Sequence, residues 1–162
     1  MQKWLIVLGG ILIAIVVYEV LRRQVLKRTA LKIRLTGQRT TDAAMLTVLT
    51  ALSSAKTAQQ VSGQLHSTPV AAVWGRGVMA FEYVLDMPGM VPEDLPEIRK
   101  LLNNHLQAYA TDEGLTAFRD AGPVLRVTDT WLRDQQLHVD VAYLMNEATL
   151  EYLEDLRRLN RD

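Results

Sequence analysis

Cysteine is absent from the 162 residues of this chain, and so are the short motifs that mark most enzyme classes. Without cysteine there is no disulfide framework and no thiol nucleophile, which fits a reducing compartment. The only Gly-x-Gly sequence, at 75–77, lies between two predicted strands, so it indicates a hairpin turn rather than a phosphate loop. No serine lies in a Gly-x-Ser-x-Gly elbow, and the three histidines lack the spacing of metal ligands. We therefore expect no cofactor and identify no catalytic motif.

The longest apolar stretch of the chain covers residues 4–21. As a helix it would extend about 27 Å, close to the roughly 30 Å hydrocarbon core of a bilayer. Trp4 and Tyr18 stand near its two ends, where aromatic rings prefer the headgroup level. A cleaved signal peptide would need small residues after the apolar run, but residues 22–24 are Arg-Arg-Gln. The pattern predicts an uncleaved single-pass transmembrane anchor over 1–21.

Two small residues, Gly10 and Ala14, form a small-x-x-x-small pattern inside this stretch. Such faces let two helices approach closely, so self-association through them is one hypothesis. The lipid bilayer and other membrane proteins are the further partners expected of such an anchor.

Basic residues dominate the next segment, the neck over 22–39, which contains no acid. They are Arg22, Arg23, Lys27, Arg28, Lys32, Arg34 and Arg39. Basic flanks stay on the cytoplasmic side, so the pattern predicts a cell-membrane protein whose remaining domain is cytoplasmic. The neck is expected to lie on anionic lipid, with about 1 kcal/mol of attraction per base. Glu19, one turn before this segment, is expected to pair with one of its first two arginines.

The remaining chain, residues 40–162, is expected to be one acidic, soluble domain of ordinary size. From Asp42 onward there are seventeen acids and ten bases, a net charge of −7 that the neutral total conceals. Phosphate contacts dominate nucleic-acid affinity, so we expect no nucleic-acid partner for so acidic a domain.

Hydrophobic periodicity divides this domain into helices and strands. We expect strands over 69–74, 78–86, 124–132 and 137–145, and helices over 40–62, 94–109 and 146–159. Residues 31–35 alternate apolar and basic side chains, which favours one more strand, although a continuation of the preceding helix is the open alternative. Phe81 and Tyr83 are predicted to lie on the buried face of their strand.

The predicted fold class is α+β, with a single transmembrane helix followed by an antiparallel-rich sheet that carries helices on one face. The first six elements of the domain follow the β-α-β-β-α-β order of ferredoxin-like folds. One more strand and a C-terminal helix are expected after them.

The second predicted hairpin holds the arrangement most suggestive of chemistry. With its turn centred between residues 134 and 135, Asp129 faces Asp140 and Trp131 faces His138, all on one face. Like charges directly opposite are destabilising, so such a pair is typical of a metal or acid–base site. Asp129, Asp140 and His138 are therefore the candidate site residues. The alternatives are that both carboxylates point to solvent, or that the register differs by one residue.

The last predicted helix gathers acids on its outward side. Glu151, Glu154 and Asp155 are the candidate contacts for a basic partner, whose association would be salt-sensitive. The alternative is a face that is merely solvated.

The layout of one short anchor and a small α+β domain is similar to that of accessory subunits of bacterial secretion, conjugation and division machines, by architecture alone. We therefore expect a non-enzymatic, membrane-anchored subunit or scaffold whose cytoplasmic domain binds protein partners. One alternative is a membrane-tethered enzyme that uses the second hairpin. Another is an extracytoplasmic envelope- or pilus-associated domain, against which the basic neck argues.

Overall fold

The computed structural model describes the backbone of residues 2–54, 65, 67–70 and 77–159. Within the first helix, the side chains at 2–11, 13–14, 25–30 and 53–54 also lie outside the described part. The chain divides into two compact units, Met1–Leu35 and Thr36–Asp162.

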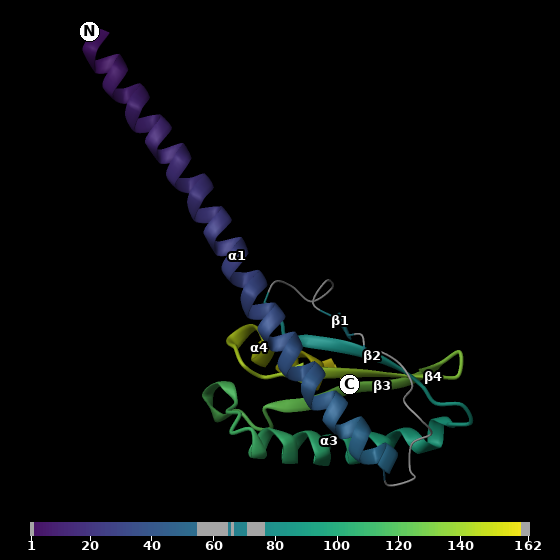
Figure 1. Ribbon diagram of the computed structural model, residues 1–162. Coiled ribbons are helices and arrows are strands. Elements are labelled where there is room, and N and C mark those ends of the chain that lie inside the picture. The colour runs from purple at the N-terminus through teal and green to yellow at the C-terminus, as the bar shows by residue number, and fades with distance from the viewer. Residues whose placement is uncertain (1, 55–64, 66, 71–76, 160–162) are drawn as a thin grey trace. The chain divides into compact units, whose positions relative to one another are not determined.

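Helix α1 spans Gln2–Ser54 and contributes residues to both units (Figure 1). The predicted strand over 31–35 is wrong, because these residues continue the helix. Extending an existing helix needs no new nucleation, and no proline precedes Pro69 to interrupt it. The apolar side chains at 31, 33 and 35 are all exposed, so the alternation that suggested a strand has no buried face.

No helix among the described residues is both long and apolar enough to cross a membrane. A span needs about 20 mostly apolar residues. The predicted transmembrane anchor over 1–21 and the predicted single-pass location in the cell membrane are therefore wrong.

Several residues of the predicted anchor and neck have no described side chain. They are Trp4, Gly10, Ala14, Lys27 and Arg28. The described members Tyr18, Arg22, Arg23, Lys32 and Arg34 are exposed. Glu19 pairs with Arg22 at 3.5 Å and with Arg23 at 3.8 Å, as expected from their spacing. The predicted contact of the neck with anionic lipid rests on these charges and stays a prediction.

In the second unit, four strands form one antiparallel sheet in the order β1-β2-β4-β3 (Figure 1). The strands are β1 Ser67–Pro69, β2 Ala80–Asp86, β3 Leu125–Arg133 and β4 Gln136–Tyr143. Helices α3 (Leu95–Asp112) and α4 (Glu147–Leu159) each follow a pair of strands, and short 3-10 helices cover Pro92–Asp94 and Phe118–Asp120. The predicted α+β class and antiparallel sheet are therefore confirmed.

The β-α-β-β-α-β order of a ferredoxin-like fold is not observed among the described elements, because its predicted first strand belongs to α1. Of the predicted strand over 69–74, Pro69 is the last residue of β1, and residue 70 lies in a turn. Residues 71–76, which carry the rest of that prediction, lie outside the described part.

One face of the sheet packs against α3 and the second-unit part of α1. Phe81 and Tyr83 of β2 are fully buried there, as their alternation with polar neighbours predicted. Met45 from α1 and Leu106 from α3 belong to the same core. Burying a large apolar side chain contributes roughly 1.5–3 kcal/mol, so this layer is a main source of the unit's stability.

Helix α4 packs on the opposite face. Ala80 of β2 and Ala142 of β4 are fully buried in a second cluster with Tyr152 and Leu153. Helices thus lie on both faces, and the prediction of helices on one face is wrong. Asn146 caps α4, with its Oδ1 accepting a hydrogen bond of 2.9 Å from a backbone amide of the first turn.

Candidate functional site

The hairpin of β3 and β4 has the register that its sequence predicted. Asp134 and Gln135, with φ of 51° and 63°, form a two-residue turn typical of tight hairpins. This turn places Asp129 opposite Asp140 on the neighbouring strand. A β-bulge at Thr128 shifts the register only on the side away from the turn, so it leaves this pair intact.

Trp131 and His138 also face each other across this hairpin. Their rings stack with centroids 4.9 Å apart and planes inclined by 16°. Cross-strand pairs of this kind contribute about 0.2–1 kcal/mol. The stack also restricts the ring plane of His138, so the imidazole is held in one orientation on the sheet.

Strand β2 adds a carboxylate that the sequence did not identify as part of the site. Glu82 lies opposite Asp140, and its Oε1 is 2.8 Å from Nδ1 of His138. The His138 and Glu82 side chains are 13% and 31% exposed. The alternation within residues 78–86 already put Glu82 on the face away from Phe81. The alternation could not predict that β2 pairs with β4, because these strands are distant in sequence.

Asp140 is nine-tenths buried, with only 8% of its surface exposed. Its Oδ1 is buried and has no hydrogen-bond partner among the described residues. Burial, followed by the charges of Glu82 and Asp129, raises the pKa of Asp140 to about 6, while His138 opposes the rise. The carboxyl therefore titrates close to neutral pH, as functional carboxyls often do.

The row formed by Glu82, Asp140 and Asp129 runs across three strands. In the part of the chain that the structure describes, no group of three or more histidine or acidic side chains is placed to hold a metal ion. Asp129 is exposed, and its Oδ1 accepts the amide of Thr130 at 2.8 Å. Another close polar contact of this row is the 2.8 Å approach of Glu82 Oε1 to Nδ1 of His138.

The α4 acids that were expected to contact a partner lie at the surface. Glu151, Glu154 and Asp155 are all exposed, and Asp155 pairs with Arg158 at 3.3 Å. Exposed ion pairs contribute about 0–1 kcal/mol and leave their charges accessible. Partner binding at these acids stays a prediction.

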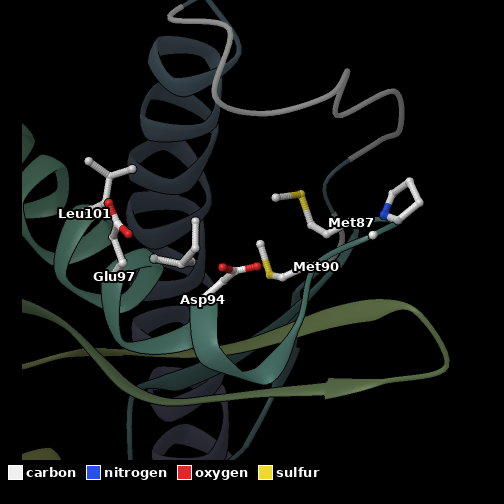
Figure 2. A pocket seen from close by; sticks show the side chains of 8 residues that line it. Met87, Met90, Asp94, Glu97 and Leu101 are labelled. Carbon is white, nitrogen blue, oxygen red and sulfur yellow. The ribbon is translucent and has the colours of Figure 1, made fainter.

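A pocket of about 340 Å³ lies between the turn after β2 and the start of α3. Figure 2 shows Met87 and Met90 on one side and Glu97 and Leu101 on the other. The complete lining is Met87, Pro88, Gly89, Met90, Asp94, Glu97, Ile98 and Leu101. Methionine adapts to irregular apolar shapes, which suits it to surfaces that receive partner side chains.

This pocket adjoins the core. A small apolar space of about 20 Å³ shares Met87, Ile98 and Leu101 with it and is also lined by Leu52 of α1. An apolar side chain that enters the pocket would meet apolar atoms on the side of the core and the carboxylates of Asp94 and Glu97 at the rim. The side of the core favours an aliphatic group over a polar one.

Local hydrogen bonds hold the rim of the pocket. The Met90 amide donates to the Met87 carbonyl at 3.2 Å, and Pro88 and Gly89, with φ of 87° at the glycine, take the central positions of a type II turn. The Asp94 carboxylate accepts the amide three residues before it at 3.0 Å. These bonds preform one wall of the pocket before any partner arrives.

Comparisons with protein-family models, curated proteins and solved structures found no match to this chain. The geometry of these two sites is therefore the basis for a functional proposal.

Proposed function

We propose that the second unit is a protein-interaction domain that binds a short partner segment in the pocket of Met87 and Met90. The segment inserts one aliphatic or methionine side chain and presents a neighbouring lysine or arginine to Glu97. The single observation that carries this proposal is the methionine-lined pocket, whose rim is preformed and acidic (Figure 2).

The size of the pocket suits an anchoring side chain. Its volume of about 340 Å³ lies at the low end of the range for ligand sites, roughly 300–1,000 Å³. Burying one leucine-sized side chain contributes about 1.5–3 kcal/mol, or roughly 10- to 100-fold in affinity. The pocket would therefore supply one strong contact within a larger interface.

Charge determines which segment is favoured. From Asp42 onward the chain carries seventeen acids against ten bases, and Glu97 is exposed at the rim of the pocket. Opposite charges on a partner accelerate encounter and make binding sensitive to salt. A segment with a lysine or arginine beside its apolar anchor would place the apolar side chain in the pocket and the positive charge near Glu97.

A peptide-display selection against the full 162-residue chain tests this proposal. Enriched peptides should combine an aliphatic or methionine residue with a nearby lysine or arginine. Met90→Glu replaces part of the apolar wall by a carboxylate and should weaken their capture by about tenfold or more, because the apolar anchor loses its contact and would desolvate the new charge.

The matched control is Leu46→Glu, which adds the same charge at an apolar residue that is 58% exposed and outside the pocket lining. Its capture of the enriched peptides should equal that of the wild type. Enrichment without the apolar-basic pattern, or capture that survives Met90→Glu, would contradict the proposal.

Acid–base chemistry is a second candidate function, favoured by the 2.8 Å contact between Glu82 Oε1 and His138 Nδ1. A carboxylate at Nδ1 retains a proton there, which leaves Nε2 as the basic nitrogen. Hydrolysis rates on a panel of hydrolase substrates test this function. Activity in the wild type that is lost in a folded His138→Gln variant would support it. Equal rates for the two proteins would contradict it.

A further inference from the structure

A second pocket, of about 580 Å³, lies where α3 meets the edge strand β3. Its lining includes two arginines and three amide side chains but no acid: Arg99, Asn103, Asn104, Gln107, Gly122, Pro123, Arg126 and Val127. The second unit carries more acidic than basic residues. A pocket lined by two arginines and no carboxylate therefore differs in charge from the unit as a whole.

Arg99 is engaged by the protein itself. Its Nη2 donates to the carbonyl of Thr128 at 2.8 Å and to that of Val127 at 3.4 Å. Asn103 donates to the Arg99 carbonyl and accepts the Val127 amide, both at 2.9 Å. These bonds tie α3 to β3 and fix the charge of Arg99 beside the pocket.

Arg126 differs, because its half-buried guanidinium makes no hydrogen bond or ion pair with the residues that the structure describes. Burial lowers the pKa of Arg126, and the charges of Arg157 and Arg99 lower it further. A guanidinium has five N–H donors, and leaving them unpaired near like charges is unfavourable. An anion at this position would relieve both effects.

Gly122 determines how closely the guanidinium approaches the neighbouring loop. A Cβ at Gly122 would lie only 3.2 Å from Nη2 of Arg126, and the φ of +110° at this residue favours glycine. The absence of a side chain therefore gives Arg126 the space it occupies in the lining of the pocket.

We propose that this pocket binds a small metabolite through a phosphate group, with Arg126 as the direct contact and Asn104 and Gln107 as further donors. The planar fork of arginine matches two oxygens of a phosphate, and Arg99 adds a second positive charge that suits a dianion. At about 580 Å³ the pocket has room for more than the phosphate itself. A long polyanion such as nucleic acid is opposed by the acidic surface around it.

An NMR titration of the full chain with inorganic phosphate, at constant pH and ionic strength, tests the proposal. The Gly122 amide and the Arg126 Nε–H should shift saturably, with half-saturation at a lower concentration than acetate requires. Arg126→Gln should weaken binding by about tenfold or more, because hydrogen bonds to a charged group are lost. Arg133→Gln, at an exposed arginine elsewhere on β3, should bind like the wild type.

Arg126→Lys keeps the charge without the fork, so its affinity should fall between those of the wild type and Arg126→Gln. This variant decides the question if Arg126→Gln fails to fold. Shifts in the wild type that do not saturate, no preference for phosphate over acetate, or equal affinities of the wild type and Arg126→Lys would each overturn the proposal.

Discussion

Glu82 Oε1 lies 2.8 Å from Nδ1 of His138, although the two residues are 56 positions apart in the sequence. The contact exists because β2 pairs with β4 in a register that sets Glu82 opposite Asp140, two residues from His138 on the same face. Trp131 stacks on the same imidazole from β3. Three strands therefore position one histidine ring.

The first prediction concerns the tautomer of that ring. Because the Glu82 carboxylate retains a proton on Nδ1, the neutral ring of His138 should carry its hydrogen there. Glu82→Ala removes the acceptor and should shift the population toward the Nε2–H form, which ring ¹⁵N chemical shifts report. Asp129→Ala, at a carboxylate on the same face, is the control and should change little. An Nε2–H ring in the wild type would contradict this account.

The second prediction is a pH dependence that originates at Asp140. Its pKa of about 6 lies above the ordinary 3.8, so the folded protein binds this proton more tightly than the unfolded chain does. The free energy of unfolding should therefore fall as pH rises from about 4 through 6. A difference of roughly two pH units corresponds to at most about 3 kcal/mol.

Asp140→Asn removes this titration. Relative to the wild type, the variant should gain up to about 3 kcal/mol between pH 4 and pH 7 in urea unfolding of the full chain. Asp134→Asn, at an exposed acid in the hairpin turn, should follow the wild-type profile. Parallel profiles for the wild type and Asp140→Asn would rule out this origin of the pH dependence.

The third prediction concerns the hydrogen bond that Tyr83 of β2 donates to Asp42 Oδ1 of α1, at 2.8 Å. Hydrogen bonds to charged groups contribute about 1.5–3 kcal/mol, so Tyr83→Phe should lower the free energy of unfolding by that amount. A double-mutant cycle with Asp42→Ala, which removes the acceptor, isolates the pair. Strictly additive losses would show that the two side chains are not coupled.

The fourth prediction tests the buried face of β2. Phe81 is fully buried, so Phe81→Ala should lower the free energy of unfolding by about 3–5 kcal/mol. Val84→Ala truncates a side chain that is 43% exposed on the opposite face, and it should change stability by only about 0.5 kcal/mol. Comparable losses for the two variants, measured by urea unfolding, would contradict the assignment of faces.

The hairpin register could be predicted because two local features agree. The polar turn at 134–135 and the alternation along each strand both pair Asp129 with Asp140. The bulge at Thr128 had no local signal, but it lies beyond the pair as counted from the turn and does not disturb it.

The predictions that failed depend on contacts between segments, which the alternation of side chains along a single segment does not reveal. Residues 31–35 alternate like a strand, but they continue a helix that is already formed. Ala80 and Ala142 alternate with large core residues, yet their own face is covered by α4. Glu82 reaches His138 only because β2 pairs with β4, and that pairing joins residues distant in sequence.

The decisive measurement is the affinity of one selected peptide for three proteins of the same length: the wild type, Met90→Glu and Leu46→Glu. Met90→Glu should bind about tenfold or more weakly than the wild type, and Leu46→Glu should bind equally well. The affinity of the wild type should fall as salt is raised. Equal affinities of the wild type and Met90→Glu would contradict the claim that this pocket receives the partner.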